Sequence, residues 1–349
     1  MAGLFQQLGA SVIDLGFLFS FSLFSEAGKK GYDMNWGTSV VLVLLNLIWG
    51  ASYVAAKIGL QEMPPFTLAV VRFAVASVLM LPFLWKERKQ AGIGFSEWPE
   101  LAFIGLLGFT FTYVFQYAGM TMTTATNSAL LLVAEPALIA VFAWIILREP
   151  FTLPKFAGLA AAMAGVILLS NIDYSQVSLL KNEVIWGNLL VFMSMAASAW
   201  FTIAGKNTLQ RHSPLVVTTY ALIFGTLFLV PFALFELRGH PLPAISWRGW
   251  GAVLYLAVLC TVVSYSAWYI ILQHNEAGKM AVFLNLQPLV GVFLGVFYLH
   301  EQVNRYTVLG GLLIIAGVYL TTTARGAPAK SGRRGERAVA HESEKTIGG

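Results

Sequence analysis

Long apolar blocks, each close to 20 residues, recur along almost the whole chain. They lack the alternation of apolar and polar positions that marks a helix on a water-soluble core. A helix needs about 20 mostly apolar residues to cross the roughly 30 Å hydrocarbon core of a bilayer, because it rises about 1.5 Å per residue. The blocks therefore predict an all-α membrane protein with ten transmembrane helices, at 38–57, 66–85, 100–118, 126–147, 153–170, 184–205, 214–235, 249–271, 278–299 and 303–323.

Charge is too scarce in this sequence to cover the surface of a soluble protein. Charged residues make up 11% of the chain and hydrophobic residues 57%, whereas a soluble domain carries about 25% charged residues. The connections between blocks are short and no GxxxxGK phosphate loop is present, which excludes an attached ATPase. The net charge of +5 lies in loops and the tail, and we expect no nucleic-acid partner, no cofactor and no metal.

The distribution of basic residues indicates the orientation in the membrane. If both termini are cytoplasmic, 16 of the 22 Lys and Arg residues fall on the cytoplasmic side and five on the other side, while Arg72 lies inside a helix. Cytoplasmic loops of membrane proteins carry an excess of Lys and Arg. We therefore predict a multi-pass protein of the cell (inner) membrane with both termini in the cytoplasm.

The two ends of the chain lie outside the ten predicted spans. Residues 1–35 are apolar and lack the basic start of a signal peptide, and we expect a peripheral N-terminal segment on the membrane. The alternatives are a true start at Met34 or an eleventh span. Residues 324–349 are rich in Gly, Arg, Lys, Ser and Glu, which is typical of a disordered tail, here predicted to be cytoplasmic.

The membrane part contains two copies of one pattern. The copies match first at an offset of 149 residues, as in Lys57 and Lys206, and later at 152 residues, as in Pro136 and Pro288. Each copy holds five helices, and because five is odd, the second copy enters the membrane in the opposite sense. Inverted repeats are an architecture of secondary transporters, whose substrate site lies at the repeat interface near mid-membrane. The predicted repeats are 36–172 and 184–323.

Three stretches resemble the EamA domain of the drug/metabolite transporter (DMT) superfamily. They are NLIWGASYVAAKIGLQEMPPFTLAVVRFAVASVLMLPFL, NSALLLVAEPALIAVFAWIILREPFTLPKFAGLAAAMAGVILL and LNLQPLVGVFLGVFYLHEQVNRYTVLGGLLIIAGVYL. The resemblance covers about residues 36–323. It implies a ten-helix carrier, often an exporter of amino acids, nucleosides or related metabolites. His300 stands where the family commonly has a small residue, and Gln287 replaces the acid of the first copy, so we do not expect the halves to be functionally identical.

Glycine spacing predicts where two of the helices pack closely. Gly158 and Gly165 in one copy, like Gly310 and Gly317 in the other, are seven residues apart and so share one helix face. Small residues let helix backbones approach in a bilayer, where lipid provides no hydrophobic drive for helices to associate. We expect the fifth and tenth helices to pack on partners, most simply on each other.

Several predicted helices carry polar and aromatic residues on one face. Asn46, Trp49 and Tyr53 follow each other at spacings of three and four in the first helix. Such residues also serve as interhelical contacts or interfacial belts, but Asn46 and Trp49 lie too deep for a belt. Convergence of these faces predicts a large aromatic cavity with few hydrogen-bonding groups. The predicted cavity residues are Asn46, Trp49, Tyr53, Arg72, Tyr113, Glu135, Ser198, Trp200, Tyr265, Trp268 and Gln287, with Pro136 and Pro288 as kinks or gates.

Glu135 is the only acidic residue deep in the ten predicted spans. An acid inside a membrane span is a candidate functional residue, and the following Pro136 removes a backbone donor. Counting residues places Glu135 about 13 Å and Arg72 about 9 Å from the same membrane surface. We hypothesise that these two side chains pair at a gate or hold a zwitterionic substrate, and a fixed structural ion pair is the alternative. Protonation of Glu135 would add coupling to protons.

These observations favour a secondary transporter that exports small amphipathic metabolites, such as amino acids, across the cytoplasmic membrane by alternating access. A phosphate site would need several converging Arg and Lys residues, and only Arg72 lies deep in the predicted spans. An intramembrane enzyme and a lipid flippase are the alternatives, although no HExxH or GxSxG motif supports an enzyme. The expected partners are a metabolite, the lipid bilayer and, as a candidate coupling ion, the proton. We expect the chain to act as a monomer.

Overall fold

The computed structural model describes the greater part of the predicted membrane region. The described residues are 36–87, 93–135, 138–139, 141–142, 145, 153–169, 183–239, 244–275, 280, 283–284 and 286–323. All secondary structure in these ranges is helical, and they contain no β-strand. The predicted peripheral segment (1–35) and the predicted tail (324–349) lie outside the described residues, so both stay predictions.

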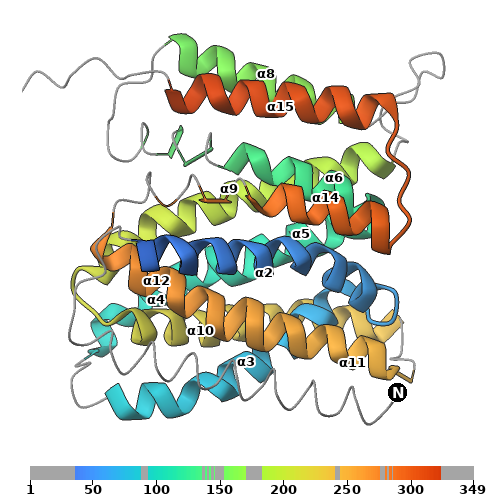
Figure 1. Ribbon diagram of the computed structural model, residues 1–349. Coiled ribbons are helices and arrows are strands. Elements are labelled where there is room, and N and C mark those ends of the chain that lie inside the picture. Colours follow the sequence, from blue (N-terminus) through green and yellow to red (C-terminus); the bar gives the residue numbers. More distant parts are fainter. Residues whose placement is uncertain are drawn as a thin grey trace, which may run out of the picture.

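The helices lie largely side by side along one direction, as in a bundle (Figure 1). In the first half of the chain they are α2 (Trp36–Leu60), α3 (Pro65–Glu87), η1 (Phe95–Glu97), α4 (Trp98–Gly105), η2 (Leu106–Phe111), α5 (Thr112–Met122), α6 (Ala125–Leu131), η3 (Leu132–Ala134) and α8 (Leu153–Leu169). In the second half they are α9 (Glu183–Leu209), α10 (Pro214–Gly239), α11 (Trp247–Leu254), η5 (Tyr255–Val263), α12 (Ser264–His274), α14 (Leu286–Tyr298) and α15 (Arg305–Thr323).

The lengths of the helices agree with a protein that crosses a membrane several times. The segments that are long and apolar enough to span a bilayer are Trp36–Leu60, Pro65–Trp85, Phe95–Met122, Glu183–Gly205, Pro214–Arg238 and Trp247–His274. Shorter apolar helices occupy Ala125–Ala134, Phe156–Gly165, Leu286–Tyr298 and Arg305–Gly317. These fall within the other four predicted spans, and residues next to several of them lie outside the described ranges, so the number of ten spans stays a prediction.

The bundle presents apolar side chains outward and buries polar ones. Val78, Phe235 and Leu289 are each more than half exposed, whereas Asn46 and Thr110 are fully buried. Soluble proteins rarely expose large contiguous apolar surfaces, but lipid accepts such a surface without cost. Together with the long apolar helices, this distribution identifies a multi-pass membrane protein.

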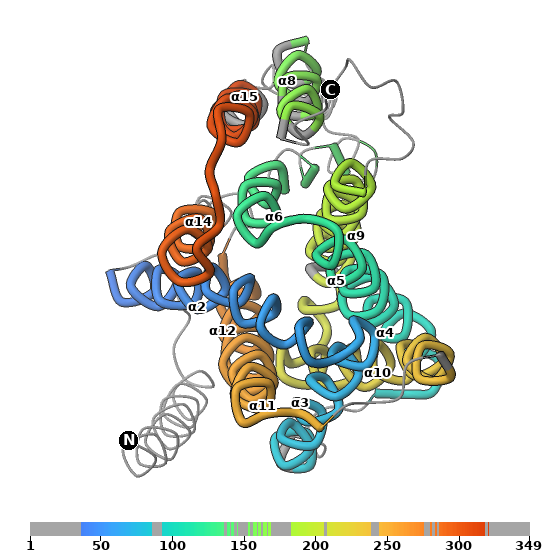
Figure 2. Tube along the Cα trace, turned by 90° about the vertical axis from the view of Figure 1, so that its right-hand side faces the viewer, coloured from blue at the N-terminus to red at the C-terminus, as the bar shows by residue number. Residues whose placement is uncertain are grey.

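Corresponding helices of the two halves pack against each other. The pairs are α3 with α10, α6 with α14, and α8 with α15. Figure 2 shows α8 and α15 together at one edge of the molecule, away from the helices around its centre. A Cβ at Gly165 would lie 2.7 Å from the Gly310 carbonyl oxygen and 2.9 Å from the Ile314 nitrogen. Only glycine permits this approach of two backbones, and the predicted packing of the fifth helix on the tenth is confirmed.

Two stretches of π-helix occur at corresponding places in the halves. η2 follows α4 and η5 follows α11, and the two stretches begin 149 residues apart. The Thr112 hydroxyl, directly after η2, donates to the Leu107 carbonyl, and the Thr261 hydroxyl, within η5, donates to the Leu256 carbonyl. Both bonds are 2.8 Å long and reach five residues back. A π-helix is wider than an α-helix and is frequent at functional sites. It also changes which side chains share a face, and this matters for the cavity described below.

Two charged side chains hold the helices together at the end of the bundle where α2 ends. Lys57 donates to the carbonyls of Met120 and Thr123 near the C-terminus of α5. The Glu301 carboxylate accepts from the first two backbone N–H groups of α6, both at 2.8 Å. A cation at a helix C-terminus and an anion at a helix N-terminus each complement the helix dipole. The turn between α5 and α6 is thereby tied to α2 and to the segment before α15.

Candidate functional site

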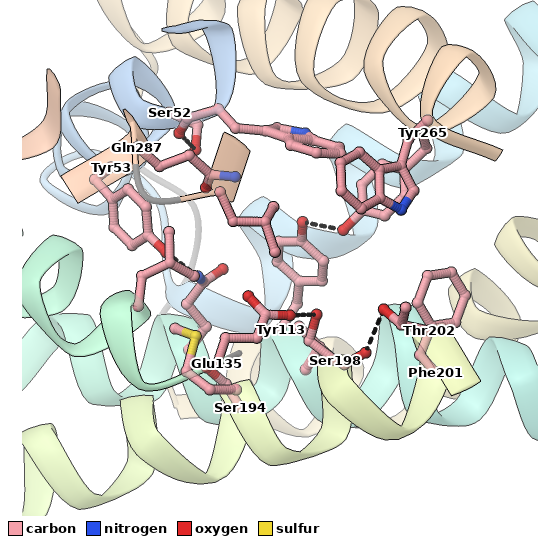
Figure 3. Close-up of a pocket in the computed structure, with 17 residues that line it drawn as sticks. Ser52, Tyr53, Tyr113, Glu135, Ser194, Ser198, Phe201, Thr202, Tyr265 and Gln287 are labelled. Carbon is pink, nitrogen blue, oxygen red and sulfur yellow. Dashed lines mark hydrogen bonds between the residues drawn. The ribbon is translucent and has the colours of Figure 1, made fainter. Parts of the chain in front are cut away.

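A cavity lies within the bundle and is lined from both halves of the chain. It holds about 690 Å³ of space free of protein atoms, including the part that is open to the surroundings. Figure 2 shows the contributing helices around the centre of the molecule, and Figure 3 shows the lining side chains. Among the described residues, the helices supply Trp49, Ser52 and Tyr53 (α2), Thr112, Tyr113 and Gln116 (α5), Leu132 (η3), Ser194, Met195, Ser198, Phe201 and Thr202 (α9), Tyr265 and Trp268 (α12), and Gln287 (α14). Glu135, directly after η3, and Leu284, before α14, complete this list.

Among the described lining residues, Glu135 supplies the only carboxylate. It follows η3 and is 7% exposed, and the Ser198 hydroxyl donates to its Oε1 at 2.6 Å. Ser194 and Thr202 lie four residues to either side of Ser198, so α9 turns a face rich in hydroxyl groups toward the cavity (Figure 3). Hydrogen bonds to charged groups are about twice as strong as neutral ones. Ser198 therefore holds the carboxylate at the wall, and within the described residues its Oε2 has no protein partner.

Aromatic rings form a rigid wall of the cavity. The Trp49 indole N–H donates to the Cys260 carbonyl at 3.0 Å. The Trp49 ring meets Tyr265 and Trp268 edge to face, with centroids 5.5 Å and 5.4 Å apart. Edge-to-face contacts are a preferred geometry of aromatic pairs. Because the indole is fixed by both a hydrogen bond and two ring contacts, its face is a preformed surface for a ligand.

Tyrosine hydroxyl groups supply most of the remaining polarity near the rings. The hydroxyls of Tyr113 and Tyr265 are hydrogen-bonded at 2.9 Å (Figure 3). The Gln116 side-chain amide donates to the Tyr53 hydroxyl at 3.4 Å. The described part of the lining therefore combines one carboxylate and several hydroxyl and amide groups with a large aromatic surface, and no Arg or Lys occurs in it.

Arg72 does not line the cavity and does not pair with Glu135 in this conformation. Arg72 is 2% exposed, and its Cζ lies 4.6 Å from the centroid of the Tyr113 ring. It donates to the hydroxyls of Thr261 and Tyr117 and, at 3.4 Å, to that of Tyr113. The salt bridges among the described residues lie elsewhere, between α4 or η1 and the turn before α10. The expected ion pair is therefore not formed, because neutral hydroxyls occupy the guanidinium.

Eight of the eleven predicted cavity residues are in the lining, and Arg72, Asn46 and Trp200 are not. Asn46 is buried behind it, where its side-chain oxygen accepts from Gln287 at 2.7 Å. Trp200 is 37% exposed and packs on Phe142. It lies two residues from Ser198, and residues two apart on a helix point in different directions. The interpretation of Trp200 as a cavity residue is therefore corrected.

The two predicted kinks stay predictions. Pro136 lies outside the described residues. Pro288 lies in α14, and residues 283 and 284 before it are helical as well, but residue 285 lies outside the described residues.

Some lining residues were not among the predicted ones, and helical spacing could have found several of them. Ser194 and Thr202 share the face of Ser198, and Gln116 lies three residues after Tyr113. Thr112 is harder to place from sequence, because η2 interrupts the α-helical spacing just before it. The full set of additional lining residues is Ser52, Thr112, Gln116, Leu132, Ser194, Met195, Phe201, Thr202 and Leu284.

Comparison with known proteins identifies the family. The model of the EamA-like transporter family matches residues 36–171 and 185–323. The chain belongs to the EamA-like transporter family. Its function is therefore membrane transport. Because the matched residues include all the lining residues given above, the cavity belongs to the family domain itself.

Individual relatives of this EamA-like transporter agree with that role. An uncharacterized transporter of Archaeoglobus fulgidus is 34% identical over 289 residues, which are 83% of this chain and 98% of the relative. The uncharacterized transporter YetK of Bacillus subtilis is 28% identical, with 87% and 92% covered. A probable amino-acid metabolite efflux pump of Salmonella typhimurium is 27% identical, with 80% and 92% covered. A solved crystal structure resembles the fold with a TM-score of 0.57 at 17% identity, over 82% of this chain and 96% of that chain.

Proposed function

We propose that this EamA-like transporter is a secondary carrier that exports small amphipathic metabolites, amino acids foremost, across the cytoplasmic membrane by alternating access. The observation that carries this proposal is the cavity, in which one carboxylate and several hydroxyl groups face a preformed aromatic wall. An ammonium group would pair with Glu135, and an apolar side chain would lie on the rings. The printed name of the Salmonella relative, an amino-acid metabolite efflux pump, supports the same class of substrate.

The architecture that we propose is ten spans in two inverted five-helix repeats, with both termini in the cytoplasm. The packing of α3 on α10 and of α8 on α15, and the matched positions of η2 and η5, support a two-fold relation between the halves. Two similar halves around one cavity provide two near-equivalent states, open to one side or the other. A reporter fused after Ala324 should map to the cytoplasm, and an external location would refute this orientation.

We propose a monomer as the unit of transport and the proton as the coupling ion. Both halves of one chain contribute residues to the lining of one cavity, and this supports the monomer as the unit. Glu135 is the one carboxylate among the described lining residues, and a carboxylate that binds a proton and a cationic substrate in turn would couple the two fluxes. No Arg or Lys occurs among the lining residues that the structure describes, and this argues against phosphorylated substrates.

The test measures flux through the purified protein alone. Vesicles that contain only this protein are loaded with an unlabelled amino acid, and the entry of the labelled amino acid is followed for a panel of apolar and polar amino acids. Glu135→Gln keeps the shape and removes the charge. We expect it to reduce exchange and to abolish the pH dependence. Glu183→Gln, an exposed acid in the first turn of α9, is the matched control for loss of charge outside the cavity.

The same vesicles separate the alternatives. If the protein transports no amino acid but moves labelled lipid between the leaflets, it is a lipid flippase and the proposed substrate class is overturned. Normal exchange by Glu135→Gln at every pH would show that the carboxylate is structural and would remove its role in coupling.

A further inference from the structure

Arg72 on α3 is a buried cation without an anionic partner in the part of the chain that the structure describes. Its hydrogen bonds go to the neutral hydroxyls of Tyr113, Tyr117 and Thr261. The Phe73 and Tyr113 rings add cation–π contacts at 4.8 Å and 4.6 Å. Burying a charge costs a large free energy unless an opposite charge compensates it. A residue needed only for packing would not carry this cost, so the charge requires an explanation.

The hydroxyl of Tyr113 links Arg72 to the cavity. Its oxygen accepts from Arg72 Nη2 at 3.4 Å, and it shares a hydrogen bond of 2.9 Å with the Tyr265 hydroxyl. A hydroxyl whose oxygen faces a cation is a better donor than acceptor, so its proton is directed to the Tyr265 oxygen. The proton of Tyr265 then has no acceptor among the described residues, and both tyrosines line the cavity. Figure 3 shows this hydroxyl pair on a different wall from the Glu135–Ser198 pair.

We propose that Arg72 acts through Tyr113 and Tyr265 to bind the carboxylate of a zwitterionic substrate whose ammonium group lies at Glu135. This inference rests on the proposed function and specifies its substrate. Arg72 is a positioning residue, since it lies behind the tyrosines, and Tyr265 is the group that contacts the ligand. The zwitterion supplies the counter-charge that Arg72 lacks and the cation that Glu135 lacks. An amine without a carboxylate would satisfy only Glu135.

A control variant can separate the role of Arg72 in binding substrate from its role in packing. Tyr117 also accepts a hydrogen bond from Arg72, but it does not line the cavity. Tyr117→Phe therefore removes a comparable contact of the same guanidinium without altering the wall that a substrate meets. It is the matched control for Tyr265→Phe.

The experiment compares L-leucine and L-phenylalanine with their amides, which keep the ammonium group and lack the carboxylate. Exchange is measured in the vesicles at about pH 6, below the pKa of an α-amino group. In Tyr265→Phe we expect the transport efficiency of each amino acid relative to its amide to fall about tenfold, the effect of losing a hydrogen bond to a charged group. In Tyr117→Phe we expect the wild-type ratio. Arg72→Lys, which keeps the charge but not the forked donors, should lower the ratio as Tyr265→Phe does.

The outcomes distinguish this inference from the proposed function. If Tyr265→Phe and Tyr117→Phe change the amino acid and the amide by the same factor, the hydroxyls are structural and the inference is overturned, while transport of amino acids stands. If the wild type prefers the amides, the inference is also overturned. If the wild type transports none of the four compounds, the proposed substrate class fails and the inference fails with it. Thermal unfolding of each variant in detergent identifies any loss that is due to misfolding.

Discussion

The substitution Gly108→Ala tests whether Phe201 sets the size of the cavity. A Cβ at Gly108 would contact Phe201 Cδ2 most closely and would lie 2.5 Å from Cε2 and 2.7 Å from Cγ. Carbon atoms pack at about 3.5–4.0 Å, so the ring must move by about 1 Å. Phe201 is stacked on Tyr269 at 5.2 Å and packs on Phe109 at 5.7 Å. The ring also packs on Tyr265 at 6.2 Å. Because Phe201 lines the cavity, the ring is expected to move into it.

The expected cost is that of overpacking a core, about 1–3 kcal/mol, and it should appear as a lower unfolding temperature. Transport should change selectively, because a displaced ring excludes a bulky side chain before a small one. We expect the efficiency for L-phenylalanine to fall more than that for L-alanine in Gly108→Ala. Adding Phe201→Leu should restore both stability and the ratio, since the smaller side chain leaves room for the new methyl group.

The control is Gly251→Ala in α11, where a Cβ would meet no atom within 4 Å. Alanine is favoured over glycine in a helix by up to about 1 kcal/mol, so this variant should be as stable as the wild type or slightly more so. A Gly108→Ala protein with the wild-type unfolding temperature and the wild-type substrate ratio would refute the reasoning. It would mean that the ring moves elsewhere and does not bound the substrate.

Further predictions concern the aromatic wall, the helix pair at the edge and one surface carboxylate. Trp49→Ala should change the ranking of transported substrates at near-normal protein levels, and equal loss for all substrates with poor expression would mark the ring as packing only. Gly165→Leu should lower the unfolding temperature by overpacking the contact of α8 with α15. Ala164→Leu, at the neighbouring exposed position, should leave the unfolding temperature unchanged. Hydrogen bonds from Ser246 hold the pKa of the Glu62 carboxyl below its usual value. These hydrogen bonds add to the free energy of unfolding above the usual pKa of a carboxyl group, and this addition is lost as the pH falls through the lowered pKa. In an acid titration the free energy of unfolding of the wild type should therefore fall more than that of Glu62→Gln.

The membrane fold and its closest helix pair could be predicted because they depend on local properties. Apolar length identifies a span whatever its neighbours are, and the segments Trp36–Leu60 and Pro214–Arg238 are such cases. The seven-residue spacing of Gly158 and Gly165 similarly predicts a contact face without reference to a partner. Each of these features is encoded in one stretch of the chain.

The direction in which a side chain points was less predictable. Ser198 and Trp200 are both polar or aromatic residues of one helix, yet only Ser198 lines the cavity. The two residues are two positions apart in the helix and so point in different directions. Residue type alone does not reveal this difference in direction. Near Thr112 even the helical spacing is unreliable, because the π-helical turn of η2 rotates everything that follows it.

The partners of the buried charges Arg72 and Glu135 could not be predicted from the sequence either. Counting residues places both at similar depth, and electrostatics alone would then join them, since each is costly to bury without the other. The structure instead gives Arg72 the hydroxyls of Tyr113 and Tyr117, and it gives Glu135 the hydroxyl of Ser198. Neither charge is neutralised by its neighbours among the described residues, although the two together sum to zero. The cavity has an anion on one wall and a cation behind another wall, so the two charges form a dipole across it. A zwitterion in the matching orientation compensates both charges at once. An ion pair would have compensated them permanently and would have left the cavity with no electrostatic means of choosing a substrate.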